Sequence, residues 1–346
     1  MDEARTADTE ITPESPCPES EHADSFDAEK APAAQNEDRR TCNPSDDTFR
    51  AVMAQTPAWE GHPALDCNLV LEGGAMRSLF TAGVLDFLMD KGVVCQRVIG
   101  TSAGALCGYN YVAGSTGRTC YINVNFAPDP RYLSLRSFAK TGNAYGRDFS
   151  FDEIPNRIEP FDYDAYRRSP IELVAVSSDL DLGEADYHVI EDPQKDLPYV
   201  MASSSMPLVS QIVEIDGKRL LDGGTCDSIP IDYSRSTGAA KHLVVLTQDA
   251  SYRKGRDKML AIERQVYGDY PYYLERLEHR PYEYNRTIRR LERMAQAGEA
   301  FVIRPERPVG VSNIEHDQEK LFALYEHGVE VAAKAWSALK DYLEIE

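Results

Sequence analysis

The sequence lacks the patterns that mark several classes of protein. It has no run of about 18 apolar residues, the length that a membrane-spanning helix needs. Its N-terminus has no basic segment followed by an apolar one, so we expect no secretory signal. It contains neither Gly-x-Gly-x-x-Gly nor Gly-Lys-Ser/Thr, so the sequence does not favour a nucleotide-binding loop.

Cysteine and histidine form no recognisable ligand pattern. The seven cysteines include no Cys-x-x-Cys pair, and the seven histidines form no cluster with metal-ligand spacing. We therefore expect no metal and no cofactor, and we interpret the cysteines as reduced, mostly buried thiols of a cytoplasmic protein. The cysteines are Cys17, Cys42, Cys67, Cys95, Cys107, Cys120 and Cys226.

Positive charge is scarce: 37 Lys and Arg stand against 57 Asp and Glu, a net charge of −20. Repulsion between like charges makes nucleic acid an unsuitable main partner. Half of the excess negative charge lies in residues 1–60, which contain fifteen acidic and five basic residues. This segment is rich in Pro, Ala, Ser and Glu and has no apolar periodicity, which predicts a disordered acidic tail.

Beyond the tail, short apolar runs alternate with amphipathic stretches. Residues 67–74 and 93–100 are typical of buried strands, and residues 77–92 and 102–114 of helices that end at glycines. This order predicts a βαβ unit with parallel strands and a right-handed crossover. Further strands are expected within 171–179, 211–224, 241–248 and 300–306, and further helices within 161–169, 256–267, 286–298 and 317–343.

This alternation predicts an α/β fold of three layers, with a mostly parallel central sheet and helices on both faces. We expect a catalytic core over residues 64–250. A helical C-terminal region over 251–346, with one further strand, would pack on this core. Such sheets carry their chemistry at the carboxyl ends of their strands.

The stretch Val98–Leu106, "VIGTSAGAL", lies where the second strand turns into a helix. Gly100 and Gly104 flank Ser102 and permit both a strained backbone and close approach of the chain. The serine hydroxyl would then stand at the top of the sheet, at a helix N-terminus that favours a developing oxyanion.

Two other stretches belong to the same edge of the sheet. In "EGGAMRS", the small residues Gly73, Gly74 and Ala75 expose backbone N–H groups suited to an oxyanion or a phosphate. Arg77 either fixes this loop or senses an acidic head group. In "RLLDGGTCDSIPI", Asp222 ends an apolar run, so its carboxylate is expected on the same rim as the serine.

These stretches, together with "ASSSMPL" at 202–208, resemble the patatin-like phospholipase family, and in particular its bacterial branch. The resemblance covers about 68–232. It implies a serine acyl hydrolase that cleaves carboxylic esters of lipids without metal or nucleotide. In that family's pattern Ser102 would be the nucleophile and Asp222 its base.

The resemblance also implies that the backbone of Gly73, Gly74 and Ala75, near Arg77, forms the oxyanion hole. Ala75 and Ser78 stand where the family usually has glycine. If position 75 requires a positive φ, the alanine is strained by about 1 kcal/mol.

Two other readings stay open from the sequence. A Ser-His-Asp esterase would use His242 or His279 as its base. A non-catalytic module that binds lipid or a partner would use the tyrosine-rich segment 266–286, whose side chains suit an interface, and a transient contact with a membrane surface is possible. The sequence does not indicate an oligomeric state.

Overall fold

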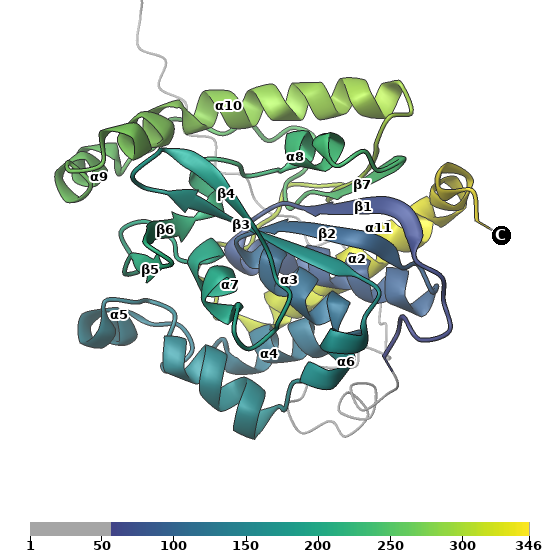
Figure 1. Cartoon of the computed structure of the whole chain (residues 1–346), viewed down its shortest axis with the longest axis horizontal. Helices are drawn as coiled ribbons and strands as arrows, with labels where there is room; N and C mark the ends of the chain where they lie inside the picture. The colour runs from purple at the N-terminus through teal and green to yellow at the C-terminus, as the bar shows by residue number, and fades with distance from the viewer. Residues whose placement is uncertain (1–56, 346) are drawn as a thin grey trace, which may run out of the picture. The chain divides into compact units, whose positions relative to one another are not determined.

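The structure is a computed structural model, and it describes residues 57–345. An eight-stranded sheet runs through these residues in the order β5-β6-β3-β2-β1-β7-β8, and β4 pairs with β3 (Figure 1). In this part of the chain, no helix combines the length and the apolar character needed to cross a membrane.

The opening of the sheet is the predicted βαβ unit. Strand β1 (Leu65–Leu71) pairs in parallel with β2 (Cys95–Thr101), and helix α2 (Leu79–Asp90) connects them. Helix α3 (Ala103–Val112) follows β2. The parallel set continues with β3 (Glu172–Asp179), β7 (Lys241–Val245) and β8 (Phe301–Ile303).

Helices cover both faces of the sheet, which confirms the predicted three layers (Figure 1). Leu69 and Leu71 belong to one apolar core, whereas Val70 between them belongs to the other, as expected for alternating side chains of a strand. Beside α2 and α3, the first face carries α4 (Arg118–Phe126) and α11 (Gln318–Leu343), and the second carries α8 (Ile231–Ser236) and α10 (Pro271–Gln296).

The C-terminal part of the chain joins the same sheet and the same core. Strand β8 pairs with β7, and α11 packs on α2. The two helices approach closely at Gly83 and Gly328, where an added Cβ would overlap the carbonyl oxygens of Tyr325 and Phe80. Glycine at these positions therefore lets the last helix lie directly against the first.

The part of the sheet beyond β3 is antiparallel, which the sequence patterns did not indicate. Strand β4 (Glu184–Val189) runs against β3, and β5 (Val213–Ile215) and β6 (Lys218–Asp222) form a hairpin within the range expected as 211–224. The remaining elements are short. They are η1 (Ala75–Ser78), α5 (Leu135–Thr141), η2 (Phe149–Ile158), α6 (Tyr163–Arg168), α7 (Leu197–Ser203), η3 (Gly223–Thr225) and α9 (Leu260–Val266).

The predicted acidic tail falls almost entirely outside the described residues. Contacts with the fold begin before residue 64, since the N–H of Ala58 donates to the carbonyl of Gly114 at 3.2 Å and Trp59 packs against the core. Cys17 and Cys42 also fall outside the described residues. The other five cysteines are free thiols, and four of them are buried.

Candidate active site

Ser102 occupies the sharp turn between β2 and α3. Its backbone has φ 57° and ψ −128°, a conformation that costs a non-glycine residue about 1–3 kcal/mol. Gly100 and Gly104 do not share this strain. They allow close packing instead, because an added Cβ would lie 2.6 Å from the N of Ala105 and 2.6 Å from the O of Leu71, respectively. The expectation that the glycines carry the unusual backbone angles was therefore wrong, because the serine carries them.

The pairing of strands β2 and β6 with β3 places Asp222 beside Ser102. Strand β4 pairs along one edge of β3, so β2 and β6 share the other edge. Strand β2 ends where Thr101 pairs with Val176, and β6 arrives from the opposite direction and pairs Asp222 with Ser177. Asp222 does lie on the rim beside Ser102, but β6 is antiparallel to β2. The two strands meet end to end, which is not the arrangement expected from a parallel sheet.

The two side chains are in contact. The Oγ of Ser102 donates to Oδ2 of Asp222 at 2.5 Å, and the residues are only 7% and 5% exposed. The N–H of Gly224 donates to Oδ1 of Asp222 at 2.7 Å. Burial raises the pKa of Asp222, and these hydrogen bonds together with the charges of Arg280 and Lys254 oppose that rise. The carboxylate is thus a stronger proton acceptor than an exposed aspartate.

The stretch 202–208 supports both members of this pair. The Oγ of Ser203 accepts from the N–H of Ser102 at 2.9 Å and donates to the O of Val176 at 2.5 Å. The N–H of Asp222 donates to the O of Ser205 at 2.8 Å. The role of Ser203 could not be predicted from the sequence, because a hydrogen bond across 101 residues leaves no local signal.

The glycine loop lies directly against the serine. A Cβ on Gly73 would lie 2.9 Å from Cβ of Ser102, so only glycine permits this approach. Of the three residues predicted to form the oxyanion hole, Gly73 donates its N–H to the carbonyl oxygen of Ser228 at 3.5 Å. The N–H groups of Gly74 and Ala75, at the start of η1, have no acceptor in the described part of the chain. Ala75 has φ 48°, so its position does require the left-handed conformation anticipated from the missing glycine.

Glu72, just before this loop, holds it in place. This buried carboxylate accepts from the N–H of Thr247 at 2.5 Å and from the hydroxyl of Tyr284 at 2.6 Å. It therefore joins the end of β1 to β7 and to α10. The role of Glu72 was not predicted from the sequence. An acidic residue that ends an apolar strand immediately before a glycine pair was the available signal.

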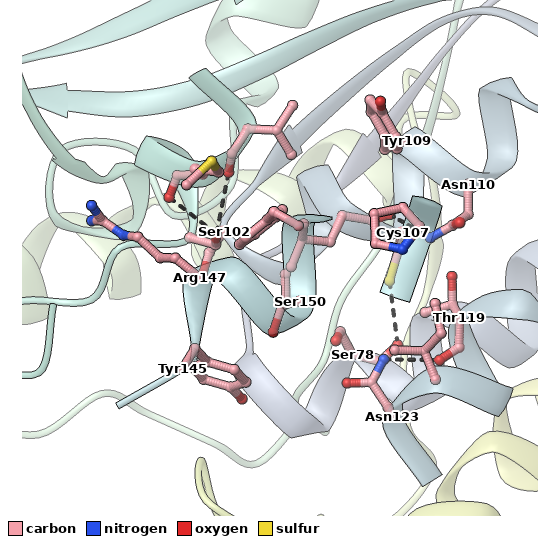
Figure 2. Close-up of a pocket in the computed structure, with 18 of the residues that line it drawn as sticks. Ser78, Ser102, Cys107, Tyr109, Asn110, Thr119, Asn123, Tyr145, Arg147 and Ser150 are labelled. Atoms are coloured by element: carbon pink, nitrogen blue, oxygen red, sulfur yellow. Dashed lines mark hydrogen bonds between the residues drawn. The ribbon is translucent and has the colours of Figure 1, made fainter. Parts of the chain in front are cut away.

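An apolar cavity of about 140 Å³ opens on one side of Ser102. Leu106, Ile122, Val200 and Phe161 contribute apolar side chains to its wall. Figure 2 draws residues that line this cavity, with Ser102, Tyr145 and Arg147 on the left of the view and Asn110, Thr119 and Asn123 on the right. The mostly apolar lining of this cavity suits a hydrocarbon chain better than a polar group.

A second cavity of about 350 Å³ also opens at Ser102, and its lining mixes charged and apolar side chains. It shares Ala75, Ser102 and Met206 with the first cavity, so the two meet at the serine. Arg77 lines this second cavity, and its Nη1 donates to Oδ1 of Asn313. The predicted site residues Gly73, Gly74, Ala75, Arg77, Ser102 and Asp222 thus surround one space.

Neither candidate histidine lies at this space. His242 is paired with Asn68 at the N-terminal end of the parallel strands, where its Nδ1 is 2.8 Å from the Oγ of Ser234. His279 is exposed on α10, with Nδ1 2.8 Å from the O of Glu275. Within residues 57–345, no three His, Cys, Asp or Glu side chains are grouped as metal ligands would be.

The tyrosine-rich segment 266–286 runs from the last residue of α9 (Leu260–Val266) into α10 (Pro271–Gln296), of which it includes residues 271–286. Tyr267, Tyr273 and Tyr284 are buried, whereas Tyr272 and Tyr282 are 61% and 59% exposed. One face of this segment therefore packs against the core, whereas about half of its residues are exposed.

Comparison with known proteins matches two regions of the chain to family models. Residues 69–234 match the family model described as patatin-like phospholipase, and residues 270–344 match a domain of unknown function, DUF6363. This chain carries a patatin-like phospholipase domain. The expected family resemblance is thereby confirmed.

Relatives of this patatin-like protein include bacterial and fungal chains. The uncharacterized protein YjjU of Escherichia coli K12 is 25% identical over 57% of this chain and 55% of its own length. A lysophospholipase, nte1 of Aspergillus niger, is 26% identical over 50% of this chain and 11% of its own. The solved structure of VipD from Legionella pneumophila has a TM-score of 0.40 at 10% identity, over 80% of this chain and 67% of that one. The matched part thus spans about half of one sequence relative and about a tenth of the other.

Proposed function

We propose that this patatin-like protein is a serine acyl hydrolase that cleaves carboxylic esters of lipids through a Ser102–Asp222 dyad. The observation that carries the proposal is the 2.5 Å hydrogen bond from the strained, buried serine to a carboxylate whose pKa burial raises. Membership of a family of carboxylic ester hydrolases supports the reaction class.

In this mechanism Oγ of Ser102 attacks the ester carbonyl while its proton passes to Oδ2 of Asp222. The carbonyl oxygen becomes an oxyanion, and the unpaired N–H groups of Gly74 and Ala75 are suited to bind it. Asp222 then returns the proton to the leaving alcohol as the C–O bond breaks, which leaves an acyl-enzyme. Water repeats these steps in reverse, with Asp222 as base, and releases the fatty acid.

The dyad suits esters better than amides. An aspartate is a weak base, so proton transfer must be concerted with attack, and stabilisation of the oxyanion carries much of the catalysis. Alcohol leaving groups need less protonation than amines. The apolar cavity beside Ser102 supports an acyl chain as the group that is transferred to the serine.

The Ser-His-Asp alternative has little support, because no histidine lines either cavity of the described chain. The free thiols support a reducing compartment, so our proposal places the protein in the cytoplasm. A transient contact with a membrane surface during lipid hydrolysis stays a prediction.

A fluorophosphonate probe, which reacts covalently with activated serines, tests the proposal. We expect a single label that peptide mapping assigns to Ser102. Labelling should survive His242→Ala and His279→Ala and should disappear in Ser102→Ala. Labelling of a different residue, or none at all, would contradict the proposed nucleophile.

A further inference from the structure

The wall of the apolar cavity beside Ser102 includes two arginines and no acidic side chain. Arg118 and Arg147 contribute to it, whereas no Asp or Glu of the described chain does. Within residues 57–345, neither arginine has a carboxylate oxygen within 4.0 Å. In a chain whose net charge is −20, this cavity therefore has an excess of positive charge in its wall.

Arg147 is bonded to the loop that supports the dyad. This half-buried side chain donates from Nη2 to the Oγ of Ser205 at 3.1 Å and to the O of Gln211 at 2.7 Å. The carbonyl of Ser205 in turn accepts from the N–H of Asp222 at 2.8 Å. Arg147 therefore holds the loop behind the dyad.

Arg118 is almost completely withdrawn from water, since the residue is only 7% exposed. Its Nη1 donates to Oδ1 of Asn110 at 2.9 Å, and its Nη2 donates to the backbone O of Glu159 at 2.8 Å. The guanidinium carbon lies 5.2 Å from the centre of the Phe161 ring. The buried Nε has no hydrogen-bond partner within the described chain. All of these contacts are with neutral groups, so none of them neutralises the charge.

The charge of Arg118 is only partly balanced by its surroundings. Burial lowers the pKa of its guanidinium to about 10, and the carboxylate of Glu159, which lies beyond 4.0 Å, opposes that fall only in part. A guanidinium that stays charged away from water is strongly unfavourable unless an anion pairs with it. The described chain places no anion against Arg118, so its charge is available to a group on a ligand in the cavity.

Arg118 lies at the end of the cavity away from Ser102. Ser102 immediately precedes α3, and Asn110, which is bonded to Arg118, lies further along this helix, at about 12 Å from Ser102 for a rise of about 1.5 Å per residue. Figure 2 shows the same separation, with Ser102 on the left of the view and Asn110 on the right. Leu106 and Val200 are among the apolar side chains of the wall. A ligand that reaches from the serine to the arginine is therefore apolar in its middle and charged at its end.

We propose that Arg118 binds a carboxylate at the distal end of the acyl group, so that the substrates are monoesters of dicarboxylic acids. The ester carbonyl would lie at Ser102, and the terminal carboxylate would accept hydrogen bonds from the guanidinium, including its unpaired Nε. The planar donors of arginine match a carboxylate in geometry. This inference rests on the proposed function for the acyl-enzyme at Ser102 and goes further by assigning the acyl group. Hydrolysis adds water across the acyl C–O bond and releases a dicarboxylic acid and the alcohol.

Two chromogenic esters test this substrate class on the unmodified protein. p-Nitrophenyl hydrogen sebacate carries a terminal carboxylate, and p-nitrophenyl methyl sebacate is its neutral counterpart. We expect kcat/KM to be about 10- to 100-fold higher for the free carboxylate, the effect of one charge-assisted hydrogen bond. The corresponding pair of succinates is too short to span about 12 Å, so the carboxylate should give no advantage there. Equal turnover of the two sebacates, or faster turnover of the methyl ester, would overturn the proposal.

Arg118→Met tests the cation, and its readout is the ratio of the two kcat/KM values, which a general loss of activity does not change. This variant removes the charge and keeps an unbranched apolar side chain, so we expect the preference for the free carboxylate to disappear. Arg118→Lys retains the charge without the planar donors and should keep a reduced preference, which supplies the test if Arg118→Met does not fold. Arg168→Met removes an exposed arginine of α6 outside the cavity and should leave the ratio unchanged. A full preference in Arg118→Met would overturn the proposal.

Calorimetry with Ser102→Ala separates this inference from the proposed reaction, because binding needs no turnover. We expect p-nitrophenyl hydrogen sebacate to bind at least about tenfold more tightly than the methyl ester, and Arg118→Met in this background to remove the difference. If the unmodified protein hydrolyses neither ester, this selective binding still supports the carboxylate site, and the proposed function alone fails. Equal binding of the two esters would overturn the inference and leave the proposed function standing.

Discussion

Ser203 offers a perturbation that separates positioning from chemistry. Its Oγ joins the N–H of Ser102 to the carbonyl of Val176, all within the buried core of the site. Ser203→Ala removes both hydrogen bonds and leaves a buried N–H without an acceptor, which costs about 1–3 kcal/mol. For a domain of this size, each 1 kcal/mol lowers the melting temperature by about 2–4 °C.

Ser203→Ala should also lower the rate of catalysis, and by more than its loss of folding stability alone would explain. The N–H of Ser102 belongs to a residue held at φ 57°, and Ser203 is the side chain that anchors it. A displacement of about 1 Å at a nucleophile can cost about 100-fold in rate. We therefore expect kcat for a soluble ester to fall about 10- to 100-fold, measured below the melting temperature of the variant.

Ser234→Ala is the matched control for this experiment. Ser234 is equally buried, and its Oγ bonds to Asn68 and His242 at the opposite end of the parallel strands. Its loss should lower the melting temperature by a similar amount and leave kcat unchanged. If the two variants lose stability alike and both keep full kcat, Ser203 does not position the nucleophile and our reasoning is wrong.

Three further predictions follow from the site and from the sequence. Ala75→Gly removes the strain of an alanine held at φ 48°, so the free energy of unfolding measured in denaturant should rise by about 1 kcal/mol while ester turnover is retained. A fall in the free energy of unfolding would show that Ala75 is not strained. Burial raises the pKa of Asp222 above its unfolded value of 3.8, so ester turnover should fall as the pH is lowered through that raised pKa. At a pH above the raised pKa, the ionised carboxylate of Asp222 should destabilise the folded state. Asp222→Asn should therefore melt no lower than the unmodified protein at pH 7, and any gain in melting temperature should disappear below pH 3.8. Removal of residues 1–56, which the sequence predicts to be an unstructured tail, should change the stability by less than about 0.5 kcal/mol, and a large drop in melting temperature would refute that prediction.

The sequence was sufficient to predict the βαβ unit and the rim on which the site lies. Apolar runs that end at Gly73 and Gly100 fixed both strand ends, because parallel strands finish at a common edge of the sheet. Asp222 was also assigned to this rim, but for an incomplete reason. Its strand is antiparallel, and only the pairing of Asp222 with Ser177 brings the carboxylate level with Ser102.

Other parts of the site depend on contacts between distant segments and could not be predicted. Lys254 and Arg280 are ordinary basic residues in their own stretches, and only the packing of α10 over the sheet places them beside Arg77. The link from Glu72 to Tyr284 spans 212 residues for the same reason. Local sequence patterns indicate strands, helices and turns. They do not indicate which side chains from distant segments come into contact when the chain folds.

The central claim is that Ser102 and Asp222 act as one catalytic unit, and a double-mutant cycle tests it most directly. Ester hydrolysis should be measured for Ser102→Ala, Asp222→Asn and the double variant, with melting temperatures to show that each one folds. We predict that each single change lowers kcat by about 10³-fold or more and that the double variant is scarcely slower than either. Losses that add, or near-full activity in Asp222→Asn, would mean that another residue is the base and would contradict the dyad.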